Sequence, residues 1–352
     1  MIRQWKLTDR DSSIFTAMKT AAMLMVLIIH ADLRSHGAPQ TVVTDFYNEF
    51  FSMIMATAAV PVFFFISGFF MFRNFNFKIK FKSRIKTVYI PYFIWCTWGL
   101  FILIMLQGVL GSESLFSGKD LKLLRNFTTI DYLRVFWDIR DGEPITSTLW
   151  FLKDLCILIV LSPLLNFVVK SHSGGDFVLV MYMLGLAGVN NSLISFFSVF
   201  YFSAGGWIAY KGIDLFHKFD THRMKIFTAA IVVMLFTSIA YLWNFEYYDK
   251  IKTIWVVLCL PLLYYLCSIK KIYKSPIMMR LAEYSFFIYL FHEPIMGYLQ
   301  KLCFKFVHLP VYYQLVLYWI FPLMILTISI IVFKALKYMV PSILNILVGG
   351  RV

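Results

Sequence analysis

Lys19 and His30, two residues able to do chemistry, share one apolar segment of membrane length near the start of the chain. The eleven steps from one to the other amount to roughly three helical turns, so both side chains lie on one helix face, roughly 16 Å apart along its axis. Ionisable side chains inside a membrane usually face a bundle interior or a wet cavity, which makes them functional candidates. An imidazole suits acid or base chemistry near neutral pH. Alternatively, Lys19 extends to the membrane interface and His30 bonds a neighbouring helix.

His292 and Glu293 form a second ionisable pair, near the middle of a later apolar run, and Pro294 follows them directly. Proline removes a backbone hydrogen bond beside the pair, and polar groups inside a membrane segment are commonly functional. We therefore interpret both residues as part of a substrate-binding site. Trp150 begins another apolar run, where it is either an interfacial anchor or part of the wall of a substrate pocket.

The loop after the second apolar run carries several basic residues and no acidic one. They are Arg73, Lys78, Lys80, Lys82, Arg84 and Lys86. One explanation is membrane topology together with contact to anionic lipid. The other is a binding site for a cytoplasmic ligand with several phosphates, because Arg and Lys are the usual partners of phosphate. Ser67 and Gly68, just before the loop, allow close approach of the backbone near the inner end of the run.

The connection of about 37 residues before the fourth apolar run is long for a segment without a role. Its acidic residues lie beside aromatic ones; they are Asp131, Asp138, Asp141 and Glu143, with Tyr132, Phe136 and Trp137. Carboxylates next to aromatic rings suit a bound sugar. The same aromatic residues also suit anchoring at the membrane interface, so both interpretations stay open.

The composition indicates the kind of protein that holds these residues. Of 352 residues, 60% are hydrophobic and only 15% are charged, with a mean hydropathy of +0.73. Apolar runs of membrane length recur along the chain, which predicts an all-α, polytopic integral membrane protein. The net charge of +14 does not indicate nucleic acid, because Lys and Arg lie in the loops between apolar runs. The cysteines show no CxxC pair and no metal-type spacing with His, so we expect neither disulfides nor a metal site.

The apolar runs predict about ten transmembrane helices in a single membrane domain that covers residues 1–352. The predicted spans are about 15–34, 50–72, 88–110, 148–168, 177–190, 193–210, 225–243, 253–269, 284–302 and 312–336. With the N-terminus inside, the inner segments hold roughly twice as many Lys and Arg residues as the outer ones. Both termini are therefore expected to be cytoplasmic, on the same side as the basic loop.

Five stretches, taken in order, resemble the membrane-bound acyltransferase family 3, in the branch that O-acetylates surface glycans such as the enterobacterial common antigen. The stretches are Lys19 with His30; Val60-Pro61 leading into Phe65-Ile66-Ser67-Gly68; the basic run ending in Arg84-Ile85-Lys86 and followed by Pro91-Tyr92; Leu149-Trp150-Phe151-Leu152 with Ser162-Pro163; and Ile288-Tyr289-Leu290-Phe291-His292. Together they cover most of the chain.

The resemblance implies ten spans and transfer of an acyl group, usually acetyl from acetyl-CoA, to a hydroxyl of a surface polysaccharide or its lipid-linked precursor. His30 falls on the position that the family treats as essential. Lys19 stands where the family commonly has Arg, which keeps the charge but loses the two-pronged geometry of a guanidinium group. No SGNH-type hydrolase domain is appended, so we expect a stand-alone member.

The resemblance also implies where the donor binds. Arg84 matches a family arginine, whereas the usual basic residue three positions later is Thr87. We expect Arg84, Lys86 and Arg73 to bind the phosphates of CoA, with Ser67 beside them, while the acyl arm reaches toward His30.

In this interpretation His30 is the general base on the sugar hydroxyl and Lys19 completes the catalytic site. We expect direct transfer, because no Ser or Cys motif with an evident base stands out. The expected partners are acetyl-CoA, a surface glycan or lipid-linked saccharide, and membrane lipid, in the bacterial inner membrane. The alternative hypothesis is an exporter or flippase of a polysaccharide or lipid-linked intermediate. Such a transporter needs no acyl-CoA and often shows repeated halves, which this sequence lacks.

Overall fold

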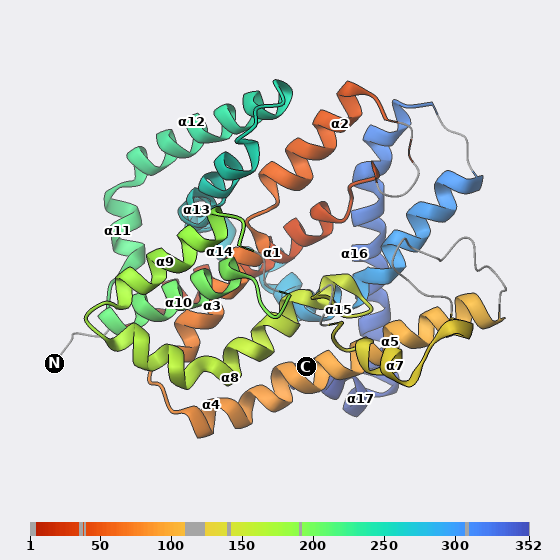
Figure 1. The fold of residues 1–352 in the computed structure, drawn as a ribbon, viewed down its shortest axis with the longest axis horizontal. Helices are drawn as coiled ribbons and strands as arrows, with labels where there is room; N and C mark the ends of the chain where they lie inside the picture. Colours follow the sequence, from red (N-terminus) through yellow and green to blue (C-terminus); the bar gives the residue numbers. More distant parts are fainter. Residues whose placement is uncertain are drawn as a thin grey trace.

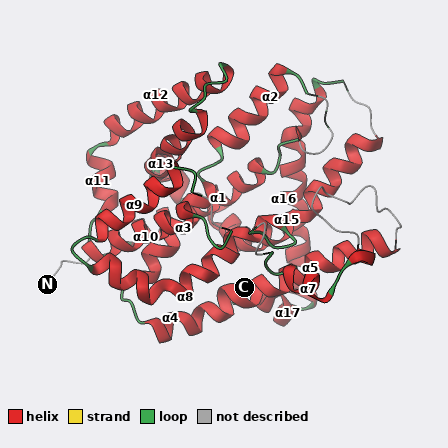
Figure 2. Ribbon diagram, in the orientation of Figure 1, coloured by secondary structure: helices red, strands yellow, loops and turns green. Residues whose placement is uncertain are grey.

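The computed structural model describes residues 5–34, 38, 40–109, 124–138, 142–189, 192–306 and 310–351. Within these residues the chain is helical and contains no strand, as Figure 2 shows. The prediction of an all-α fold is therefore confirmed. Asp141, one of the acidic residues in the long loop, lies outside the described residues.

Seven helical segments are long and apolar enough to cross a membrane. They are Asp9–Ile29, Val42–Phe72, Phe77–Gln107, Ser147–Lys170, Arg223–Leu242, Tyr248–Cys267 and Tyr313–Met339. The other three predicted spans also coincide with helices: α9 (Gly174–Leu186) and α10 (Phe196–Lys211) are shorter, and α15 (Pro276–Phe306) is long but is not one of these seven. The protein is thus a multi-pass membrane protein; the count of ten spans and the side of the termini stay predictions.

The long helical segments are built from consecutive elements. Their bounds are α1 Asp9–Ile29, α2 Val42–Asn48, η2 Glu49–Met55, α3 Ala59–Phe72, α4 Phe77–Arg84, η3 Ile85–Tyr89, α5 Ile90–Ile104, η4 Met105–Val109, α8 Trp150–Lys170, α12 Arg223–Leu242, α13 Tyr248–Cys267 and α16 Tyr313–Met339. The short elements are η5 Leu124–Asn126, α7 Thr129–Arg134, η6 Ser147–Leu149, α11 Leu215–Thr221, α14 Lys270–Tyr273 and α17 Pro341–Leu347. Figure 1 shows α4 and α5 in line along the bottom of the view.

Three of these elements are stretches of π-helix: η2 and η3 lie inside longer helices, and η4 directly follows α5. Such stretches are rare and occur frequently at functional sites, because the extra residue per turn turns the following side chains to a new direction. The η3 stretch begins directly after Arg84. The basic segment of the sequence is therefore helical in its second half, and its last residues lie at a local change of helix geometry.

Helix α1 lies at the centre of the bundle and packs against α3, α13, α15 and η2. A capping box starts it: Asp11 N donates to Thr8 Oγ1 over 3.2 Å, and Thr8 N donates to the Asp11 carboxylate over 3.0 Å. This box satisfies two of the backbone N–H groups that a helix start leaves without partners. The helix ends at Ile29, and His30 is its C-cap residue. Lys19 and His30 therefore come from one rigid element, as predicted.

Helices α3 and α10 pack against each other at very short range. A Cβ atom on Gly68 would lie 1.9 Å from the Phe202 carbonyl oxygen, and one on Gly205 would lie 2.0 Å from the Phe65 carbonyl oxygen. Small residues at such crossings let two backbones approach inside a membrane. The close approach predicted at Gly68 is therefore present, and its partner is α10.

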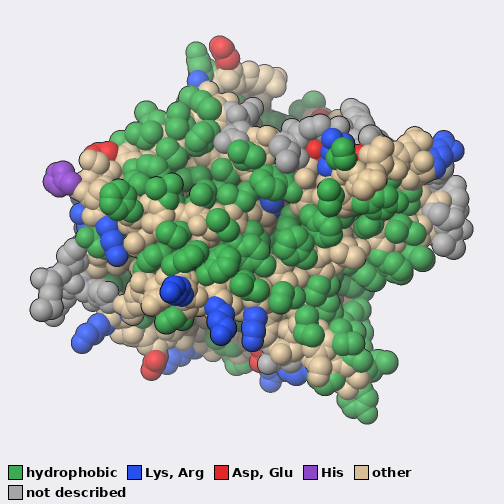
Figure 3. Space-filling model, turned by 60° about the horizontal axis from the view of Figure 1, so that its bottom comes forward, with side chains coloured by type: hydrophobic (Ala, Val, Ile, Leu, Met, Phe, Trp, Pro, Cys, Tyr) green, Lys and Arg blue, Asp and Glu red, His purple; other side chains and the backbone are tan. Residues whose placement is uncertain are grey.

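The surface agrees with a membrane setting. Hydrophobic side chains cover most of the face in Figure 3, and several Lys and Arg side chains lie along its lower edge. Large apolar side chains such as Phe167 on α8, Met224 on α12 and Leu323 on α16 are exposed. An apolar band bordered by basic residues is the pattern expected for a helical membrane protein, because lipid replaces water around the band.

Candidate functional site

His30 lies at the end of α1, where side chains from three other elements hydrogen-bond the backbone. Ser52 and Tyr318 donate hydrogen bonds to the Ile28 carbonyl oxygen over 2.9 and 3.2 Å, and Gln300 donates to the His30 carbonyl oxygen over 3.1 Å. The last carbonyl groups of a helix have no partner within it, so these bonds satisfy groups that would otherwise be buried and unpaired. The backbone at His30 is consequently held from η2, α15 and α16.

The structure brings His292 next to His30. The two imidazole ring centroids lie 5.1 Å apart, and the His292 side chain is fully buried. Its Nδ1 lies 2.7 Å from the Tyr289 carbonyl oxygen; because a carbonyl only accepts, Nδ1 carries the proton. Within the described residues Nε2 of His292 has no hydrogen-bond partner. His292 therefore packs behind the His30 ring in a fixed orientation.

A bend in α15 accompanies this arrangement. Glu293 has non-helical backbone angles (φ −108°, ψ 142°) and is followed by Pro294. The residue before a proline is pushed away from the helical region, so the bend follows directly from the sequence. Glu293 is partly buried beside His292 and does not line the cavities described below.

His30 lines a cavity of about 360 Å³, here called the histidine cavity. Its wall includes Pro61 from α3, Thr148 from η6, Trp150 from the start of α8, and Lys252 from α13. The Trp150 side chain thus belongs to a pocket wall, which was one of the two interpretations open from the sequence. A titratable imidazole, an indole face and an ammonium group therefore share one concave site.

Charged residues of η2 and α13 surround Lys252 at the edge of this cavity. Lys252 Nζ lies 3.2 Å from the Asp249 carboxylate and 3.6 Å from that of Glu49. Glu49 also accepts a bond from Arg34 over 3.0 Å. Burial lowers the pKa of Arg34, but its bonds to Asp32 and Glu49 outweigh this and hold the pKa above its ordinary value.

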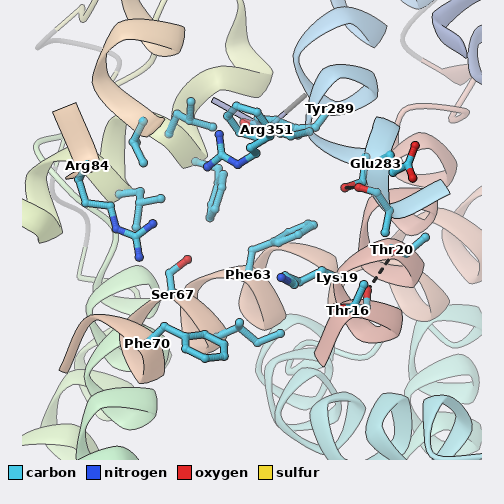
Figure 4. Close-up of a pocket in the computed structure, with 18 residues that line it drawn as sticks. Thr16, Lys19, Thr20, Phe63, Ser67, Phe70, Arg84, Glu283, Tyr289 and Arg351 are labelled. Carbon is cyan, nitrogen blue, oxygen red and sulfur yellow. Dashed lines mark hydrogen bonds between the residues drawn. The ribbon is translucent and has the colours of Figure 1, made fainter. Parts of the chain in front are cut away.

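A second cavity, of about 390 Å³, is here called the cation cavity. It is lined by Lys19 from α1, Arg84 from the end of α4, Arg351 from the segment after α17, and Ser67 from α3. In Figure 4 these side chains come from different elements and extend toward a common space. Among the described residues, none of the three cations forms an ion pair. Glu283 of α15 lines the same cavity and forms no ion pair with them.

The two cavities meet at Phe151 and Tyr289, which line both. The two rings lie 5.8 Å apart between centroids in an edge-to-face arrangement. The Tyr289 hydroxyl donates to the Thr148 carbonyl oxygen over 2.8 Å, and this bond holds the Tyr289 ring in the wall between the cavities. Lys19 and His30, three turns apart on α1, therefore face separate chambers that abut at an aromatic wall.

The remaining residues of the predicted donor site lie elsewhere. Lys86 is exposed and Arg73 is half-buried, and neither lines the cation cavity. Of the four residues expected to bind the donor, the structure brings Arg84 and Ser67 together with Lys19.

Sequence reasoning missed Arg351 and Lys252. Arg351 follows two glycines far from every stretch that carried the resemblance, and Lys252 is separated from His30 by most of the chain. Spacing along one helix finds partners such as Lys19 and His30, but it gives no information on residues that only the tertiary fold brings together. The Gly-Gly pair before Arg351 was the one local signal, because glycines often mark a left-handed backbone conformation or a close backbone approach.

The fold and the cavities together define a multi-pass helical membrane protein in which the cation cavity lies beside the histidine cavity. A family model described as "Acyltransferase domain" matches residues 13–336. The chain therefore belongs to this acyltransferase family, membrane acyltransferase family 3, and the predicted family is confirmed.

A curated relative and the solved structures add two further findings. The succinoglycan biosynthesis protein ExoH of Rhizobium meliloti (strain 1021) is 26% identical over 175 residues, which are 49% of this chain and 46% of that protein. The match thus spans about half the length of the relative. No solved structure matches the chain.

Proposed function

We propose that this protein is a membrane O-acyltransferase that moves an acetyl group from cytoplasmic acetyl-CoA to a hydroxyl of a surface polysaccharide or its lipid-linked precursor. The observation that carries the proposal is the pair of abutting cavities. One contains three cations that form no ion pair with any described residue, which suits a ligand with several phosphates, and the other contains His30. A single donor molecule lying across the aromatic wall would place its acyl group beside the imidazole.

The cation cavity suits the phosphate-bearing part of the donor. Phosphate groups bind Arg and Lys through charge-assisted hydrogen bonds, which are about twice as strong as neutral ones. Lys19 and Arg84 offer such bonds from two elements, and Ser67 adds a hydroxyl. In this arrangement Lys19 binds the donor and does not transfer a proton. Its role in the catalytic site is therefore donor binding.

His30 carries the chemical step. Its imidazole removes the proton of a sugar hydroxyl, and the resulting oxygen attacks the thioester carbonyl carbon of the donor. The carbon–sulfur bond then breaks, the CoA sulfur leaves as thiolate and takes up a proton, and the new ester carries the acetyl group. His292, buried against His30 and bonded to the backbone, keeps the imidazole from turning away.

The histidine cavity suits a saccharide acceptor. Trp150 provides an aromatic face for a sugar ring, and Thr148 and Lys252 provide polar groups around it. A relative that is named for the biosynthesis of succinoglycan supports a glycan as the acceptor. The bacterial inner membrane is the compartment where such a donor and such an acceptor meet.

The test is release of free CoA thiol by the purified protein with acetyl-CoA and the host glycan. We expect glycan-dependent release by the wild type and a rate lower by at least about 100-fold for His30→Ala, because general base catalysis contributes roughly 10²–10⁴-fold. His217→Ala is the matched control, since His217 is an exposed histidine on α11. A His30→Ala variant as fast as the wild type would contradict the mechanism. Glycan movement across vesicles without thiol release would favour the exporter.

A further inference from the structure

The segment after α16 folds back onto the cation cavity. Helix α17 packs against α5, and the Trp95 indole N–H donates to the Leu347 carbonyl oxygen over 3.1 Å. Gly349 follows with a φ of +63°, and a Cβ atom there would lie 2.7 Å from Thr87 Cα. Only glycine suits both the left-handed backbone and this close approach. The segment is therefore docked against η3, immediately beyond Arg84.

Arg351 is held at the cavity by one of its terminal nitrogens. Its Nη1 donates to the carbonyl oxygens of Thr87 and Val348, each over 2.8 Å. Its Cζ atom lies 3.9 Å from the centroid of the Phe286 ring. Among the described residues, Nε and Nη2 form no hydrogen bond. The backbone and the ring thus fix the group in place while further N–H donors stay available for a ligand.

The charges around Arg351 do not balance within the described residues. Desolvation by the surrounding protein and the neighbouring positive charge of Arg84 lower the pKa of Arg351 to about 10, while part of the side chain stays exposed to solvent. Arg84, Lys19 and Arg351 line one cavity with a single carboxylate, that of Glu283. Bringing like charges together in a partly buried site is costly unless an anion occupies it. A ligand with at least two negative charges would remove this cost.

We propose that Arg351, carried by the segment 341–351, is a phosphate-binding residue of the donor site, alongside Arg84 and Lys19. This inference rests on the proposed function, because it takes the phosphates of CoA as the anionic group. The segment after α16 is then part of the binding site, and its docking through Gly349 sets the position of the third cation.

The experiment measures CoA affinity by calorimetry with the full-length protein in detergent. The variants are Arg351→Gln, Arg351→Lys, Arg84→Gln and the control Lys337→Gln, which removes an exposed charge from the end of α16. We expect Arg351→Gln and Arg84→Gln each to weaken CoA binding about tenfold or more. Arg351→Lys should lie between wild type and Arg351→Gln, and Lys337→Gln should match the wild type. Melting temperatures verify that each variant is folded.

The outcomes separate the inference from the proposed function. If Arg84→Gln weakens CoA binding but a folded Arg351→Gln variant binds like the wild type, Arg351 is not a ligand residue, and the proposed donor site stands without it. If the folded wild type does not bind CoA, both ideas fail. A uniform loss in all variants, Lys337→Gln included, would indicate a general charge effect and would overturn the specific role of Arg351.

Discussion

His30 gains its place from contacts made by residues that are far away in the sequence. Ser52, Tyr318 and Gln300 bond the carbonyl groups at the end of α1, and His292 packs against the imidazole ring. A catalytic group must be held in productive geometry, because a misplacement of about 1 Å can cost 10²-fold in rate. The supporting residues are therefore as important to the proposed reaction as the imidazole itself.

His292 is expected to act as a positioning residue. His292→Ala should lower kcat by on the order of 10- to 100-fold and leave the KM for acetyl-CoA unchanged, because it loosens His30 without touching the cation cavity. His292→Asn should recover part of kcat, since its amide N–H can replace the bond from Nδ1 to the Tyr289 carbonyl oxygen. Steady-state kinetics measures both. An unchanged kcat in His292→Ala, or equal losses in the two variants, would contradict this role.

The sequence allowed one part of the residue-scale site to be predicted. Lys19 and His30 share a helix, so their spacing determined their common face, and both line cavities as expected. The contact between His30 and His292 could not be predicted from the sequence, because it depends on how α1 and α15 pack. Likewise, counting basic residues in the Arg73–Lys86 loop did not distinguish Arg84, which faces the cavity, from the exposed Lys86.

The α3–α10 pair is the element-scale feature that positions the site. Ser67 lines the cation cavity from α3, while Gly68, the next residue, meets the backbone of α10. Ser67 therefore faces the cation cavity, while the adjacent Gly68 faces the neighbouring helix. Widening this contact would move Ser67 and the rest of α3 relative to α1.

Gly205→Ala is expected to destabilise the protein. The added Cβ would lie 2.0 Å from the Phe65 carbonyl oxygen, so a backbone has to move, at a cost of roughly 1–3 kcal/mol. A lower melting temperature in detergent would show this. Gly175→Ala is the matched control, because its Cβ meets only the Trp207 ring at 3.4 Å or more, and helix propensity favours alanine. Equal melting temperatures for both variants would contradict the tight α3–α10 contact.

At the element scale the sequence predicted the helices well and their pairing hardly at all. All ten apolar runs coincide with helices, because hydrophobicity over membrane length is a local property. The π-helical stretches η2 and η3 and the partner of Gly68 depend on neighbouring helices, so composition carried no signal for them. The bend at Glu293 is an exception, since Pro294 causes it locally.

On the scale of the whole molecule, the helices enclose two chambers of different chemistry that meet at Phe151 and Tyr289. The segment after α16 and the middle of α1 both line the cation cavity, whereas α13 lines the histidine cavity. Under the proposed function, the charged donor binds in the cation cavity and the acceptor in the histidine cavity. Membership of an acyltransferase family is consistent with that division of roles.

The most direct test of acyl transfer centred on His30 is the acetyl content of the host's surface glycan, measured by NMR. The strains compared carry the wild type, a deletion, His30→Ala or His217→Ala at matched membrane levels. Our account predicts that acetyl groups are lost in the deletion and in His30→Ala, are kept in His217→Ala, and that the amount of surface glycan is the same in all four. Normal acetylation in the His30→Ala strain, or loss of the glycan itself from the surface, would contradict the account.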